Sequence, residues 1–201
     1  MSDVFISYSR RDIDFVHYLF DQLKNRGLEP WADWQDIPPT ADWLNEIYRG
    51  IEAASSFLFV ITPDSVQSEI CSLEIDHAVK HNKRLIPVVR IKADNVHQEL
   101  SSHNWIFLQE EDEFDDNFGI LIQALNTDLD YVKEHARLLV RAIEWDQSRR
   151  SAAFVLNRQE LKKAKSFLLE GRNKDPQPAQ IHHDYIDFSH TQFAKKAKLI
   201  M

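Results

Sequence analysis

The sequence predicts an α/β fold in which a five-stranded parallel sheet is covered by helices on both faces. Short apolar runs alternate along residues 1–128 with segments whose apolar side chains recur every three or four positions. The first pattern is typical of buried strands and the second of amphipathic helices. Repeated strand–helix units of this length favour parallel pairing, so we expect a flavodoxin-like sandwich with its site beyond the carboxyl ends of the strands. A helical appendage is expected over residues 129–201.

The expected strands are short and apolar. They cover residues 4–8, 28–32, 57–61, 85–89 and 104–108. Pro30 lacks the N–H that a central strand donates, so the second strand is expected at an edge of the sheet. A loop that contains Pro38-Pro39 follows it.

Helices are expected between and after these strands, over residues 13–27, 44–51, 65–81 and 118–125. In the appendage, one apolar stripe of helical period runs from residue 129 to residue 145. Asn157 followed by Glu160 is close to a capping box, which predicts a second helix that ends near Gly171.

Composition excludes several classes of protein. Cys71 is the only cysteine, so an internal disulfide framework and a cysteine-rich zinc site are ruled out. The four glycines lie too far apart for a GxGxxG turn or a P-loop. The net charge is −8, and acidic residues prevail up to residue 128, which disfavours direct binding of nucleic acid. No apolar run is long enough to span a membrane and no signal sequence is visible, so we expect a soluble, cytoplasmic protein without membrane contact.

A phosphoacceptor receiver domain shares the expected fold but not the residues. Its chemistry needs an acidic pair after the first strand, an aspartate after the third and a lysine after the fifth. Here these positions read Ser-Arg-Arg, Ile-Thr and Leu-Gln. The receiver interpretation is therefore rejected.

Three motifs in order carry a resemblance to a different family. The first strand reads DVFISYS over residues 3–9, the loop after the second strand reads DWQDIP over residues 33–38, and SEICSLE covers residues 68–74. Together they resemble the TIR (Toll/interleukin-1 receptor) domain, of the bacterial type, over residues 1–128. Residues 129–201 are similar to the helical segment that follows TIR domains in multidomain bacterial signalling proteins.

This resemblance implies two rival functions. Some TIR domains are NAD+ glycohydrolases, which split NAD+ into nicotinamide and ADP-ribose or a cyclic ADP-ribose in immune or cell-death signalling. Others are non-catalytic modules that only assemble with further TIR domains. The glutamate of the third helix distinguishes the two classes, and this sequence has it as Glu74. The resemblance therefore favours the enzyme, with NAD+ as substrate and no further cofactor.

The residues around Glu74 are assigned by the same resemblance. Helical spacing places Glu74 between two apolar stripes, where a carboxylate is unusual. Ser9 and Arg10 match the turn that lines the pocket of enzymatic TIR domains, and Arg10 is a candidate clamp for the pyrophosphate. Trp34 and Trp43 flank the proline-bearing loop as candidate stacking surfaces.

Ile70 stands one turn before Glu74, where enzymatic relatives often have a tryptophan. This departure weakens the stacking hypothesis at that position and leaves the rate of catalysis open. Cys71 matches a common family residue, and a small buried thiol is the simpler interpretation.

Partners follow from the resemblance as well. Self-association through TIR domains is implied, because active sites in the family are often completed by a neighbouring domain. A C-terminal sensor, NTPase or repeat domain is implied if the chain is part of a longer protein.

A metal site is not expected. His77 and His81 lie four positions apart on one helix, with Glu74 nearby, but the spacing places no third ligand.

Overall fold

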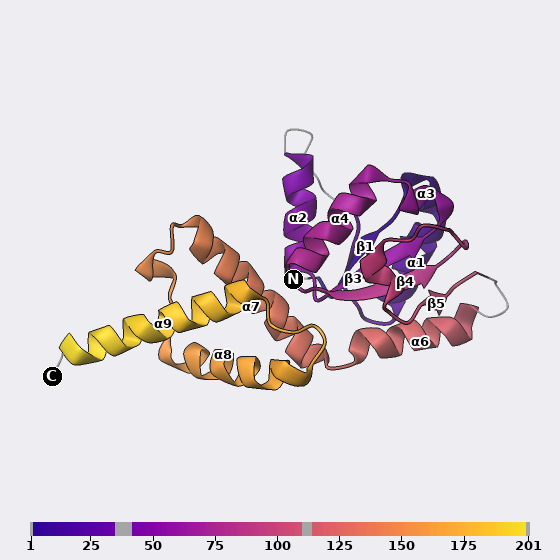
Figure 1. The fold of residues 1–201 in the computed structure, drawn as a ribbon. Coiled ribbons are helices and arrows are strands. Elements are labelled where there is room, and N and C mark those ends of the chain that lie inside the picture. The colour runs from indigo at the N-terminus through magenta and orange to yellow at the C-terminus, as the bar shows by residue number, and fades with distance from the viewer. Residues whose placement is uncertain (1, 35–41, 110–113, 200–201) are drawn as a thin grey trace. The chain divides into compact units, whose positions relative to one another are not determined.

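The chain divides into two compact units, Met1–Leu129 and Asp130–Met201 (Figure 1). In the computed structural model the described residues are 2–34, 42–109 and 114–199, and the side chains of residues 196–199 lie outside the description. Most of the proline-bearing loop, residues 35–41, is also outside the described residues. Each unit is considered by itself.

The first unit is built on a parallel sheet with the strand order β2-β1-β3-β4-β5. Its strands are β1 (Val4–Ser7), β2 (Pro30–Trp31), β3 (Ser56–Ile61), β4 (Arg84–Val89) and β5 (Ile106–Phe107). The predicted five-stranded flavodoxin-like sandwich is confirmed, and β2 lies at an edge as predicted from Pro30.

The two edge strands are shorter than predicted. β2 pairs with β1 at two positions only, because Leu28 N–H still bonds Leu23 O at the end of the preceding helix. β5 likewise pairs with β4 at two positions. An edge strand has one neighbour, so its length is set by where the chain turns rather than by its apolar run.

Both faces of the sheet are buried, and the strands divide their side chains between two cores. On β1, Val4 and Ile6 face one core and Phe5 faces the other. The first core is covered by α1 (Ile13–Asn25) and α6 (Phe114–Asn126), and the second by α2 (Trp43–Ala53) and α4 (Glu69–Lys80).

The helix expected over residues 65–81 is two helices, α3 (Pro63–Val66) and α4. Thr62 caps α3 through a capping box. Its side chain accepts a hydrogen bond from Ser65 N–H, and the Ser65 hydroxyl accepts one from Thr62 N–H. Ser68 then caps α4 by accepting from Cys71 N–H. Two caps this close begin two helices, and the prediction of one continuous helix was wrong. A short α5 (Gln98–Ser101) precedes β5, and a 3-10 turn, η1 (Arg10–Asp12), precedes α1.

The second unit is helical. It contains α7 (Leu129–Gln147), α8 (Arg158–Glu170) and α9 (Gln180–Leu199), with 3-10 turns η2 (Ala152–Phe154) and η3 (Gly171–Asn173). The capping box of Asn157 and Glu160 is confirmed at the start of α8. Two helices were predicted here, and α9 was missed because its apolar stripe is weak. Trp145, Phe167 and Tyr185, one from each helix, meet in a common core.

Among the described residues, no helix is both long and apolar enough to cross a membrane.

The cores predict a clear contrast between two isoleucine-to-alanine variants. Ile51 on α2 is fully buried, whereas Ile120 on α6 is 53% exposed. Ile51→Ala leaves a cavity and is expected to lower the free energy of unfolding by about 2–5 kcal/mol. Ile120→Ala, the matched control, is expected to change it by less than about 0.5 kcal/mol. Urea unfolding followed by tryptophan fluorescence measures both, and equal losses would contradict this assignment of the core.

Candidate active site

A cavity of about 600 Å³ lies at the carboxyl ends of β1 and β2. The chain passes from β1 to β2 on one side of β1 and then crosses to β3 on the other side of β1. The cavity at the end of β1 therefore lies where the strand order reverses. Crevices of this kind are the usual binding sites of open α/β sheets. The lining residues come from the turn after β1, the turn after β2, the start of α2 and the first turns of α4: Tyr8, Ser9, Arg10, Arg11, Asp33, Trp43, Ser68, Ile70, Cys71 and Glu74.

Glu74 is the buried acid of this cavity. Its side chain comes from α4 and is only 5% exposed. Ser7, the last residue of β1, donates a short hydrogen bond from its Oγ to Glu74 Oε2. The hydroxyl and the carboxyl are both buried, so the end of β1 holds the acid in one position.

The protonation of Glu74 is set mainly by burial. Loss of solvent raises the pKa of Glu74 to about 8. The hydrogen bond from Ser7 opposes this rise, and the negative charge of Asp33 adds to it. A carboxyl whose pKa lies near neutrality in a cavity is a common sign of a functional group.

The rim of the cavity carries a charged pair next to aromatic side chains. Arg10 Nη2 lies 3.2 Å from Asp33 Oδ2, and Tyr8 donates from its hydroxyl to Asp33 Oδ1 at 2.7 Å. The guanidinium of Arg10 lies 5.9 Å from the ring centroid of Trp43. Because the Arg10 side chain is 72% exposed, it is free to turn toward an anion in the cavity.

Five of the six residues proposed from the sequence line this cavity: Ser9, Arg10, Trp43, Ile70 and Glu74. Trp34 does not line it. Its partly buried ring packs against Tyr8, His17 and Phe20, with centroids 4.4–5.4 Å away.

Cys71 lines the cavity without being a nucleophile. It is 2% exposed, and its thiol donates to the carbonyl of Tyr8 at 3.3 Å. Burial, the largest cause, raises the pKa of the thiol to about 11. The thiol is therefore protonated at neutral pH, and only a thiolate attacks.

Ser7, Tyr8 and Asp33 also belong to the site, although they were not predicted from the sequence. Each of these polar side chains stands at or just after the carboxyl end of a strand. That position was the available signal, since sites of parallel sheets are built there.

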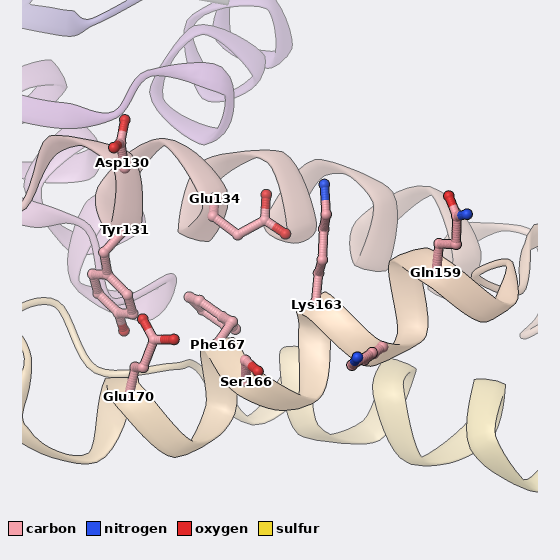
Figure 2. Close-up of a pocket in the computed structure, with 9 residues that line it drawn as sticks. Asp130, Tyr131, Glu134, Gln159, Lys163, Ser166, Phe167 and Glu170 are labelled. Atoms are coloured by element: carbon pink, nitrogen blue, oxygen red, sulfur yellow. The ribbon is translucent and has the colours of Figure 1, made fainter.

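A second cavity, of about 560 Å³, lies in the helical unit between α7 and α8. Figure 2 shows Tyr131 and Glu134 of α7 facing Lys163, Phe167 and Glu170 of α8. Glu134 is already paired with Arg137 through two contacts of 2.7 Å. The lining mixes both signs of charge, and nothing in it resembles the buried acid of the first cavity.

Comparisons with known proteins agree with the fold. The chain matches the family profile described as "TIR domain" over residues 4–122. No curated protein matches it. The TIR domain of the Toll-related receptor TRR-2 from Hydra magnipapillata aligns with a TM-score of 0.56 at 19% identity, covering 62% of this chain and 98% of that one, and this likeness shows the fold.

Two structures of a TIR-STING receptor from C. gigas are also similar. One, in complex with 2',3'-cGAMP, aligns with a TM-score of 0.52 at 26% identity over 62% of this chain and 39% of that one. The other aligns with a TM-score of 0.51 at 25% identity over 63% and 40%. The alignments therefore span about two fifths of that receptor.

The first unit is thus a flavodoxin-like α/β sandwich with a cavity at the reversal of strand order. The family match spans more than half of the chain, and this chain belongs to the TIR domain family.

The buried carboxyl predicts a specific dependence of stability on pH. The pKa of Glu74 is about 8 in the folded protein and about 4.5 in the unfolded chain. Between these values the unfolded chain releases the proton that the folded protein keeps, so stability is lost as pH rises. Glu74→Gln removes this loss. Between pH 5 and 8, the free energy of unfolding of the variant relative to the wild type is expected to rise by at most about 1.4 kcal/mol for each pH unit.

Urea unfolding of the wild type and Glu74→Gln at several pH values measures this difference. A difference in the free energy of unfolding that stays constant from pH 5 to pH 8 would show that Glu74 titrates normally.

Proposed function

We propose that the chain is an NAD+ glycohydrolase, in which Glu74 is the catalytic carboxylate. The observation that supports this most is the burial of Glu74, held by Ser7, in a cavity with an exposed arginine at its rim. The cavity volume lies within the range of ordinary ligand sites, about 300–1,000 Å³.

The reaction needs little proton transfer to its leaving group. As the bond between ribose C1' and the nicotinamide nitrogen breaks, its electron pair neutralises the pyridinium, and nicotinamide leaves uncharged. Positive charge then develops on the ribose, as in glycoside hydrolysis. A buried carboxylate beside the ribose would stabilise that charge more strongly than one in bulk water would. Water attacks C1' to give ADP-ribose and a proton, or an adenine nitrogen attacks it to give a cyclic ADP-ribose.

This role requires Glu74 to be ionised, although its pKa in the free protein is about 8. The pyridinium of NAD+ supplies a positive charge in the cavity. A nearby cation lowers the pKa of a carboxyl, so substrate binding and ionisation of Glu74 favour each other. Before substrate enters, the carboxyl is mostly neutral at pH 7, which reduces the cost of burying it.

The other lining residues would position the substrate. Arg10 would leave Asp33 to bind the pyrophosphate, and Ser9 lies beside it in the same turn. Trp43 would offer an aromatic face to a base. Ile70 provides only apolar contact at the position one turn before Glu74.

The activity would serve bacterial immune or cell-death signalling in the cytoplasm and would depend on self-association through TIR domains. In a longer protein, a C-terminal sensor, NTPase or repeat domain would control that association. Specific activity should then rise with protein concentration.

The second candidate is a non-catalytic TIR–TIR interaction module. The mostly protonated state of Glu74 favours it, since a neutral, hydrogen-bonded carboxyl can serve packing alone. The two functions differ in what the carboxylate does.

Glu74→Gln is expected to abolish nicotinamide release while the fold is preserved. The amide keeps the shape of the side chain but carries no negative charge for the transition state, so the rate should fall at least about 10²–10³-fold. Chromatography of NAD+ incubated with concentrated protein measures the loss. Glu69→Gln, on the same helix but exposed, is the matched control and should keep wild-type activity.

The same assay separates the candidates. Turnover that survives Glu74→Gln would mean that another residue is catalytic. No turnover by the wild type, even when it is clustered artificially, would favour the interaction module.

Arg10→Ala is expected to act on binding more than on chemistry. Loss of a charged hydrogen bond to the pyrophosphate should raise KM for NAD+ by about tenfold and change kcat less. Arg49→Ala is the control, because the Arg49 side chain is 73% exposed, against 72% for Arg10, and pairs only with Glu46 among the described ion pairs. Steady-state kinetics decide the matter, and an unchanged KM would remove Arg10 from the site.

A further inference from the structure

Glu52, His77 and His81 meet on the seam between α2 and α4, outside the cavity described above. The two helices pack side by side over the same core (Figure 1). Glu52 stands next to the last residue of α2, His77 lies in the last turn of α4, and His81 is the C-cap of that helix. One ligand atom from each of the three lies within 4.8 Å of the other two.

The spacing of these atoms suits a first-row divalent ion. His77 Nε2 lies 2.9 Å from Glu52 Oε1, and His81 Nε2 lies 4.0 Å from the same oxygen. Around a tetrahedral zinc ion with bonds of about 2.0–2.1 Å, neighbouring ligand atoms stand roughly 3.3 Å apart. These two distances lie on either side of that value, and the two histidine atoms lie within 4.8 Å of each other. Shifts of less than about 1 Å per side chain would therefore place all three atoms around one ion.

The side chains are held in place before any ion binds. The ring of Tyr48 stacks on His77 with centroids 4.0 Å apart and an angle of 4° between the planes. The rings of His77 and His81 meet edge to face at 4.6 Å. Lys83 donates from Nζ to the backbone carbonyl of Glu52, not to its carboxylate, so an ion could take the carboxylate without displacing the lysine.

The site is sheltered but open to solvent. The side chains of Glu52, His77 and His81 are 15%, 12% and 11% exposed. Partial burial strengthens the attraction between carboxylate and cation, and the remaining opening admits both the ion and a water as fourth ligand.

The ligand set selects the class of metal. Two imidazole nitrogens and one carboxylate oxygen suit zinc and its first-row neighbours, whereas magnesium and calcium prefer oxygen ligands throughout. Two histidines four positions apart, with a carboxylate from another segment, is a known zinc arrangement. We propose that Glu52, His77 and His81 form a binding site for a divalent transition-metal ion such as Zn²⁺, with water as the remaining ligand.

The bound ion would join α2 to α4. Binding would release to solvent the proton between His77 Nε2 and Glu52 Oε1, put the metal in its place and add His81 to the same centre. A ligand that binds only the folded state stabilises it. Zn²⁺ at about one hundred times its Kd is therefore expected to raise the Tm by about 5–10 °C.

Calorimetric titration of Zn²⁺ into metal-stripped, untagged protein tests the site directly. One equivalent is expected to bind to the wild type. His81→Gln and Glu52→Gln are each expected to weaken binding at least about 100-fold, because removing a ligand costs more than disturbing its support. The matched control is His97→Gln, since His97 also faces a carboxylate, Asp76 at 3.3 Å, but belongs to no three-membered group among the described residues.

Far-UV circular dichroism checks that each variant is folded, and Co²⁺ gives a second readout on the wild type alone. One equivalent of Co²⁺ is expected to produce the visible absorption bands of a four- or five-coordinate ion, and Zn²⁺ is expected to abolish them. The proposal is overturned if the wild type binds no Zn²⁺, if binding survives His81→Gln, or if His97→Gln loses it equally. None of these outcomes depends on NAD+ cleavage.

Discussion

The hydrogen bond between Ser7 and Glu74 joins β1, an interior strand of the sheet, to the helix that carries the acid. Both groups are buried, so neither can turn to water without opening the domain. Burial raises the pKa of the carboxyl, and the serine hydroxyl offsets part of that rise. The rest of the site depends on this balance, because it fixes where the acid stands and leaves its ionisation sensitive to whatever charge enters the cavity.

The sheet topology explains why the cavity forms beside this bond. β1 is an interior strand, with β2 on one side and β3 on the other. The helices that follow β1 and β2 cover opposite faces of the sheet, so the segments that leave these two strands diverge. Arg10 and Asp33 come from these two segments and meet across the opening at 3.2 Å. A cation paired to an acid at a rim can exchange its partner for an anionic ligand at little cost, since exposed ion pairs contribute about 0–1 kcal/mol.

Sequence patterns predicted the fold well because the period of the apolar residues and the length of each apolar run are local properties of the chain. Strands buried on both faces read as apolar runs, and the βα alternation fixed the parallel sheet. They failed where tertiary geometry decides, because β2 begins later than predicted, after the bond from Leu28 N–H to Leu23 O. Nor did they show that Trp34 packs against Tyr8. The Ser7–Glu74 bond joins residues 67 positions apart, and no spacing rule reaches that far.

The seam between α2 and α4 is a second place where spacing along the sequence does not reveal which residues meet. The sequence shows His77 and His81 as a pair on one helix. The third residue of the proposed metal site, Glu52, lies 25 positions before His77 and comes close to the pair only when α2 packs against α4. These helices also supply Trp43 and Glu74 to the cavity. A cross-link that fixes α2 against α4 therefore restricts two walls of the cavity at once, since packed helices move as rigid elements. The proposed ion and the proposed substrate would thus act on the same pair of helices.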